Sequence, residues 1–89
     1  MSLETKPMPG GQPVPQYHYT AVFEPAVEGG FIVTVPALPG LVTEGDTIEE
    51  AREMVKDAIR GYLESLVKHG EEIPIEPSPA SVERVAVNI

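Results

Sequence analysis

The chain has 89 residues, no cysteine, and a formal net charge of −8 from 6 Lys+Arg against 14 Asp+Glu. This length allows one domain, and the missing cysteines exclude disulfides and thiolate metal sites. The acidity argues against a nucleic-acid partner, because phosphates must be neutralised by cations; it fits a basic protein partner, or simple solubility, about equally well. Because so small a domain buries a modest core, we expect a homo-oligomer, a dimer or larger.

The chain contains no apolar run of membrane-spanning length, and its start lacks the basic and apolar regions of a secretory signal. We therefore expect no membrane association and a cytoplasmic location. Residues 1–16 are rich in proline and glycine, which remove hydrogen-bond donors and add entropy. They predict a disordered arm ahead of a single domain over residues 17–89.

A β-hairpin is predicted at the start of this domain. Residues 17–23 alternate with period two and carry aromatic and β-branched side chains, which is typical of a strand. Glu28, Gly29 and Gly30 then form a turn in which glycine supplies positive φ. Residues 31–35 provide the second strand, which we expect to pair antiparallel with the first.

A bend and a short third strand follow. Residues 36–40 contain two prolines three positions apart, which break the ladder, and a glycine that permits a tight turn. Residues 41–43 are suited to a third strand, which Glu44, Gly45 and Asp46 close.

The strongest local pattern is a long amphipathic helix over residues 47–69. Thr47 and Glu50 have the spacing of a capping box, and apolar residues recur behind them at helical intervals. Gly70 is a natural stop. Gly61, inside the helix, costs about 1 kcal/mol relative to alanine, and we expect close packing against the sheet as its reason.

Residues 82–89 again alternate apolar and polar and predict a terminal strand. The expected fold is therefore α+β, in the order β-β-β-α-β, with one long helix on one face of a four-stranded mixed sheet. The crossover rule favours placing the last strand parallel to the first and beside it, which gives the sheet order 3-2-1-4.

A string of residues between positions 19 and 62 is fairly specific when taken in order, although any one piece of it would be weak. Its members are Glu24, Gly29, Gly30, Phe31, Val35, Pro36, Leu38, Pro39, Gly40, Thr43, Glu44, Gly45, Asp46, Thr47, Glu50, Ala51, Ala58 and Ile59. The string covers about half of the chain, and it resembles the N-terminal domain of the HicB antitoxin family.

This resemblance implies a degenerate RNase H-like fold and a toxin–antitoxin role. HicB-like proteins bind a small HicA-type ribonuclease toxin and block it, and many carry a further C-terminal DNA-binding domain. No such domain is expected in this chain, so repression of transcription by that route is not expected either.

Catalysis is not expected. A working RNase H-like nuclease gathers several carboxylates around divalent metals, and the candidates here are Glu24, Glu50, Glu53 and Glu83. None lies in the interior of the first strand, where such an enzyme would place one. His18 and His69 have no serine or cysteine nucleophile in a recognisable motif. We therefore predict no catalytic residue, no metal and no cofactor.

The acids that helix cations do not balance lie mainly in turns and loops. Glu28, Glu44 and Asp46 flank the family-like turns, so we expect them to contact a basic partner, although solubility alone would also explain each of them. Val22, Ile32 and Thr34 would form a mixed second face of the sheet, suited to a partner or another subunit. The alternative function is an orphan domain that binds a small molecule or a metal and descends from a decayed RNase H-like enzyme.

Overall fold

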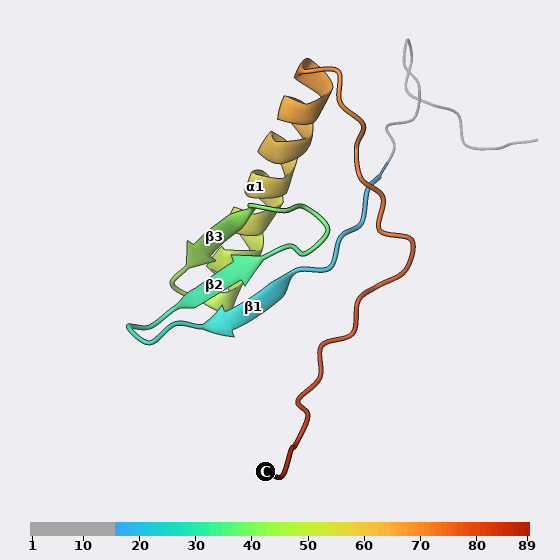
Figure 1. The fold of residues 1–89 in the computed structure, drawn as a ribbon. Coiled ribbons are helices and arrows are strands. Elements are labelled where there is room, and N and C mark those ends of the chain that lie inside the picture. Colours follow the sequence, from blue (N-terminus) through green and yellow to red (C-terminus); the bar gives the residue numbers. More distant parts are fainter. Residues whose placement is uncertain (1–15) are drawn as a thin grey trace, which may run out of the picture.

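Three strands and one helix make up the regular structure in the computed structural model, which describes residues 16–89 (Figure 1). They are β1 (Val22–Pro25), β2 (Phe31–Thr34), β3 (Val42–Gly45) and α1 (Ile48–Lys68). The α+β class is confirmed, and the sheet has the order β1-β2-β3 with antiparallel neighbours. The arm predicted over residues 1–16 lies, apart from its last residue, outside the described part of the chain. No helix within residues 16–89 has the length and apolarity needed to cross a membrane.

The predicted hairpin forms across the glycine turn, but its first strand is β1 and not residues 17–23, because residues 17–21 lie outside the ladder. The central cross-strand row joins Phe23 to Val33 and Val33 to Thr43. Gly29 and Gly30 both have positive φ, 107° and 78°, and the turn closes where the Ala26 N–H donates to the Gly30 carbonyl over 2.9 Å. The fully buried Val33 therefore lies at the middle of the sheet, on the face that meets the helix.

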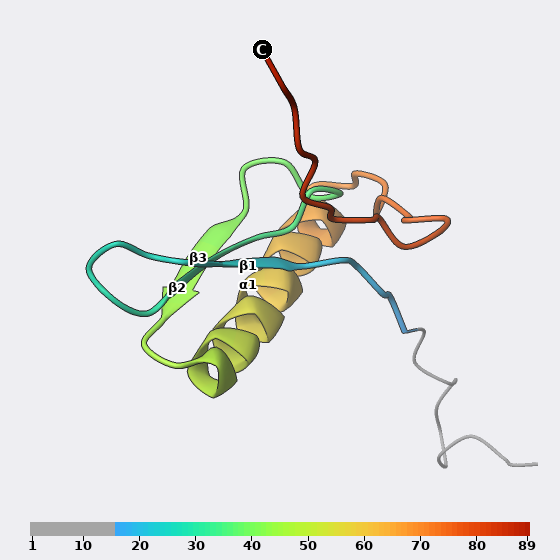
Figure 2. The ribbon, with the colours of Figure 1, turned by 90° about the horizontal axis from the view of Figure 1, so that it is seen from below.

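The helix packs on one face of the sheet only (Figure 2). Val33 and Val35 of the sheet side meet Ala51 and Val55 of α1 in the buried core. Leu38 completes this core from the bend between β2 and β3 and is fully buried. The apolar helix stripe and the apolar strand face thus exclude water from each other, as expected for a helix-on-sheet layer.

Two hydrogen bonds hold the bend over the core. The Leu38 N–H donates to the Val35 carbonyl over 2.9 Å, and the Tyr62 hydroxyl of α1 donates to the Pro39 carbonyl over 2.9 Å. Gly40 has φ 86°, a conformation that glycine adopts readily because it has no Cβ. The bend is therefore tied both to the sheet and to the helix.

The start of α1 is capped by reciprocal contacts. The Glu50 N–H donates to the Thr47 hydroxyl over 3.0 Å, and the Glu50 carboxylate accepts the Asp46 N–H over 2.8 Å. The helix is followed by Gly70 at φ 71°. The expected packing reason for Gly61 is wrong: Gly61 is exposed, and a Cβ there would meet nothing within 4 Å outside its own helix. The helix turns this position to solvent because the apolar stripe beside it faces the sheet.

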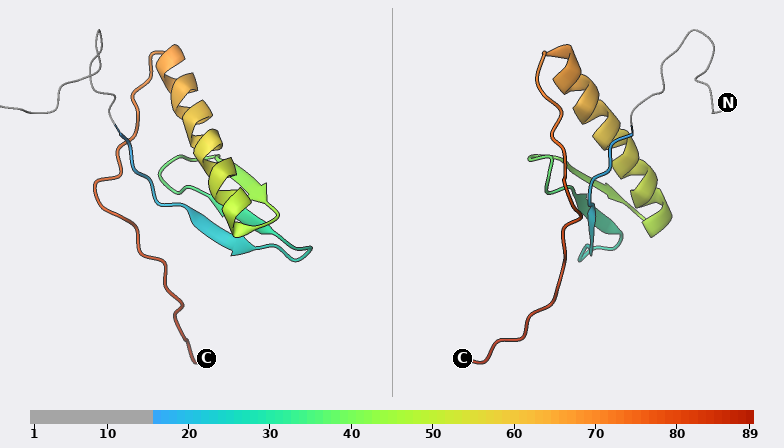
Figure 3. Two further views of the ribbon diagram at one scale, coloured as in Figure 1. Left: turned by 180° about the vertical axis from the view of Figure 1, so that it is seen from behind. Right: turned by 90° about the vertical axis from the view of Figure 1, so that its right-hand side faces the viewer.

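The fourth strand expected over residues 82–89 does not form, so the order 3-2-1-4 is not present within the described chain. After α1 the chain returns past the segment that leads into β1, then leaves the sheet and runs outward (Figure 3). Pro77 and Pro79 supply no N–H to a ladder, and the chain bends at Pro77 and Ser78. The side chain of Glu76, instead of a backbone carbonyl, accepts the Thr20 N–H over 2.8 Å. The segment after α1 therefore does not pair with β1 as a strand.

Side-chain hydrogen bonds hold this returning segment. Thr20 donates its hydroxyl to Glu76 Oε2 over 2.5 Å, and the Tyr19 hydroxyl donates to the Pro74 carbonyl over 2.6 Å. The two hydrogen bonds from Thr20 hold the pKa of Glu76 below its usual range. Burial raises the pKa of Tyr19, and the neighbouring Tyr17 and Glu76 raise it further.

Candidate protein-binding surface

Four acidic side chains lie at one end of the sheet, where β1 ends, β2 begins and β3 ends. This acidic end consists of Glu24, Glu28, Glu44 and Asp46, all exposed. Glu24 and Glu44 are the cross-strand neighbours of Ile32 on its two sides. Glu28 lies in the β1–β2 turn, and Asp46 directly precedes the helix cap.

The backbone itself brings this turn and Asp46 together. A Cβ on Gly30 would come within 2.7 Å of the Gly45 carbonyl oxygen and 3.3 Å of the Asp46 Cα. The register that pairs Phe31 with Gly45 places the turn at the same level as the end of β3. The fold therefore gathers Glu28, Glu44 and Asp46 at one end of the sheet, although they are separated by up to 18 positions in the chain.

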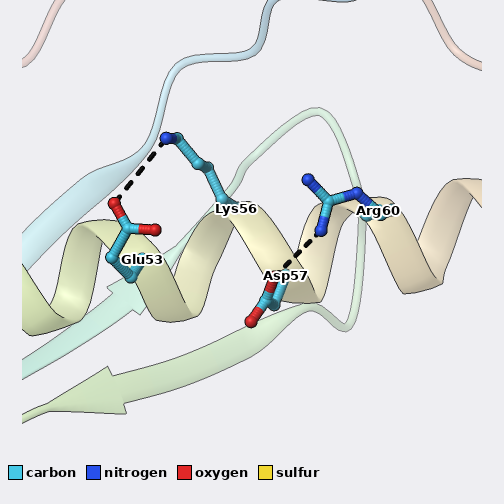
Figure 4. Close-up of polar contacts among 4 residues, drawn as sticks. All are labelled: Glu53, Lys56, Asp57 and Arg60. Atoms are coloured by element: carbon cyan, nitrogen blue, oxygen red, sulfur yellow. Dashed lines mark hydrogen bonds and ion pairs between the residues drawn. The ribbon is translucent and has the colours of Figure 1, made fainter.

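No cation neutralises the acidic end within residues 16–89. The two ion pairs in this part of the chain both lie on the exposed side of α1, Lys56 with Glu53 at 3.6 Å and Arg60 with Asp57 at 3.0 Å (Figure 4). Both pairs are three residues apart and exposed, so each contributes little to stability. These two pairs balance charge locally on the helix, and no ion pair among the described residues offsets the negative potential of the acidic end.

The residues weighed as catalytic candidates are not brought together. Within residues 16–89 no three His, Asp or Glu side chains lie close enough to hold a metal ion. Glu50 is engaged at the helix cap, and Glu53 pairs with Lys56. His18 is exposed, and the Nδ1 of His69 lies 2.8 Å from the Ser65 carbonyl at the helix end.

The face of the sheet opposite the helix is mixed and partly apolar. Val22, Thr34 and Val42 form one cross-strand row, and Ile32 lies in the next, between Glu24 and Glu44. Ile32 is 38% exposed and Val42 is 63% exposed. This open face adjoins the acidic end, so a partner can meet apolar and acidic side chains on one continuous surface.

A second feature, a groove of about 920 Å³, was not predicted from the sequence. It lies between the second half of α1 and the segment leading into β1, and its apolar lining includes Tyr19, Ala21, Ile59, Leu63 and Val67. Sequence periodicity identifies the helix residues among them as apolar, but it treats them all as core. They remain partly open because the sheet ends at β1 and nothing in the described chain extends it over them.

Comparison with known proteins agrees with the local motifs. Residues 19–88 match the family model described as the HicB_like antitoxin of bacterial toxin-antitoxin systems. A UPF0150 protein of Thermoplasma acidophilum is 50% identical over 56 residues, which cover 63% of this chain and 81% of that protein. Antitoxin HicB 1 of Photorhabdus laumondii is 41% identical over 69 residues, covering 78% of this chain and 44% of the relative.

A third relative is Antitoxin HicB of Escherichia coli K12, which is 38% identical over 61 residues, or 68% of this chain and 44% of that antitoxin. The chain thus spans less than half of each of these two antitoxins, but most of the Thermoplasma protein. The relatives point to a regulatory and non-enzymatic role. By its ordered motifs, its fold and the match over nearly all described residues, the chain belongs to the HicB-like antitoxin family of bacterial toxin–antitoxin systems.

Proposed function

We propose that this antitoxin-family protein binds and inhibits a small ribonuclease toxin of the HicA type, with Glu28, Glu44 and Asp46 in the contact. The observation that carries the proposal is the acidic end of the sheet, which is exposed and has no ion pair within residues 16–89. Membership in an antitoxin family supports a toxin partner in general.

The physical argument is electrostatic competition. A ribonuclease must present Lys or Arg side chains to RNA phosphates, so its substrate surface is basic. An acidic surface of the right spacing can occupy those cations in place of RNA, and it also steers the encounter. Ile32, between Glu24 and Glu44, adds apolar contact beside the charges.

The test is association with the product of the adjacent gene, measured by stopped-flow at several salt concentrations. We expect the triple variant Glu28→Lys, Glu44→Lys and Asp46→Lys to associate at least about tenfold more slowly at low salt, with a smaller change in dissociation. The difference should shrink as salt is raised, because exposed charges are screened.

A matched control carries the same change of charge elsewhere. Glu64, Glu71 and Glu72 are exposed and lie at or beyond the second half of α1, away from the acidic end. Replacing these three by Lys should slow association much less. Equal slowing of association by both triple variants would mean that only net charge matters. If the adjacent gene product neither binds this protein nor is neutralised by it in cells, the antitoxin proposal is refuted.

Three finer features belong to the same proposal. We infer a homo-oligomer, because the domain is small and has no disulfide. We infer a cytoplasmic site of action, since a toxin that degrades cellular RNA meets its inhibitor there. We also infer descent from an RNase H-like fold, supported by the β-β-β-α order of the described elements.

The alternative function is binding of a small apolar ligand in the groove beside α1. Its volume of about 920 Å³ falls within the usual range for ligand pockets, and its lining is largely apolar. Calorimetric titration with apolar fragments tests this alternative: saturable binding that is lost in Leu63→Glu would favour it. A metal-binding version has no support within residues 16–89, where no three potential ligands gather.

A further inference from the structure

Within residues 16–89 the outer edge of β1 has no partner, and the chain carries a segment suited to supply one. β1 pairs with β2 on one side only. Residues 82–89 form no helix or strand and are all exposed, with Val85 at 76% and Val87 at 74% exposure. An unpaired strand edge and an exposed apolar segment are both unfavourable in water, and pairing them removes both costs.

We propose that residues 82–89 of one copy pair as a strand along β1 of a second copy, in a reciprocal exchange that makes a dimer. This restores the four-stranded order within each half of the dimer, with the fourth strand supplied by the partner. Exchange of an identical element is a common route to symmetric dimers. The inference stands apart from the toxin-binding proposal, since it uses the free edge of β1 and not the acidic end of the sheet.

The composition of the segment fits a strand. Val85, Val87 and Ile89 alternate with Arg84, Ala86 and Asn88, so an extended chain carries the three larger apolar side chains on one face. A strand added to β1 can turn this face toward the helix side. The partly open groove lies there, lined by Tyr19, Ala21 and Leu63 among others.

The connection between α1 and the segment favours exchange over folding back. Ala80 donates its N–H to the Thr20 hydroxyl, and Glu76 accepts the Thr20 N–H. These bonds fix residues 76–80 beside Thr20, which lies two residues before the start of β1. The chain bends at Pro77 and Ser78, and Pro77 and Pro79 supply no ladder donors. From this point residues 81–89 run away from their own sheet in every view (Figures 1 and 3).

The first measurement is molar mass by light scattering on the full chain. We expect a dimer for the wild type and a monomer for the double variant Ala86→Pro, Val87→Pro. Successive N–H groups of a strand point to opposite edges, so this pair removes one ladder donor in any register. The control Ala86→Thr, Val87→Ile keeps both donors and strand-forming side chains and should remain a dimer. Far-ultraviolet circular dichroism checks that all variants keep α1.

The second measurement separates exchange from folding back without requiring the register. Isotope-labelled and unlabelled chains are unfolded together, refolded and studied by isotope-filtered NMR. Contacts between β1 of a labelled chain and residues 82–89 of an unlabelled chain support the proposal. The proposal is overturned if these contacts are confined to one chain, if the wild type is a monomer, or if the proline variant stays dimeric. It is also overturned if β1 pairs only with a toxin and never with a second copy of this chain.

Discussion

Gly45, at the end of β3, lies close against the first turn of α1, and replacing it by alanine should destabilise the fold strongly. A Cβ at Gly45 would lie 2.5 Å from the Ala51 nitrogen and 2.7 Å from the Ala51 Cα, closer than real Cβ contacts allow. Gly45 is buried, and its φ is not positive, so the cost arises from space and not from backbone conformation. Inserting a methyl group into a packed core costs about 1–3 kcal/mol.

The upper part of that range applies here because the obstructing atoms are backbone. They belong to the first turn of α1, which the Thr47 and Glu50 cap contacts hold next to the end of β3. We therefore expect Gly45→Ala to lower the free energy of unfolding by about 2–3 kcal/mol. In a domain of this size that corresponds to a decrease in Tm of roughly 8–24 °C.

Gly61→Ala is the matched control, since it adds the same methyl group to the same chain. A Cβ there meets no neighbour, and alanine is the better helix former, so stability should rise by about 1 kcal/mol. Urea unfolding followed by circular dichroism at one protein concentration measures both changes. A Gly45→Ala variant as stable as the wild type would refute the close approach of β3 and α1, and a loss of stability in Gly61→Ala would refute the exposed position of Gly61.

Three further changes test the core, the cap and the returning segment. Leu38→Ala removes a fully buried side chain and should cost about 2–5 kcal/mol in urea unfolding, and an effect below that range would mean that the bend does not seal the core. Thr47→Ala should cost about 1 kcal/mol in thermal unfolding, whereas Thr47→Gly should cost only about a few tenths of a kcal/mol, and an equal loss in both variants would contradict the cap. The pKa of Glu76 is lower in the folded than in the unfolded chain. Its contribution to the free energy of unfolding is therefore present above the unfolded pKa and is lost as pH falls through the folded pKa. In an NMR titration, the Thr20 amide resonance of the wild type should therefore shift as pH is lowered, whereas that of Glu76→Gln should stay constant. A Thr20 resonance that does not change with pH in the wild type would contradict the hydrogen bond.

Much of the fold is determined locally and could be predicted from the sequence. Glycines at the β1–β2 turn adopt the positive φ that the hairpin requires, and Thr47 with Glu50 caps the helix through neighbouring N–H groups. Both features depend on residues a few positions apart, so the sequence alone is enough to predict the turn and the helix cap. The family motifs are of the same kind, since they record turns, the bend and the cap.

Tertiary structure alone decided where distant groups meet. Residues 82–89 have a strand-like pattern, but they do not pair with β1 of their own chain. The Thr20 N–H, just before β1, donates to the Glu76 carboxylate, 56 positions away, and not to a backbone carbonyl of an added strand. Gly61 has the same local context as a packed helical glycine, and only the placement of α1 over β2 and β3 turns it to solvent. Sequence periodicity records which side chains are apolar, whereas their burial depends on what the rest of the chain, or a second copy, lays over them.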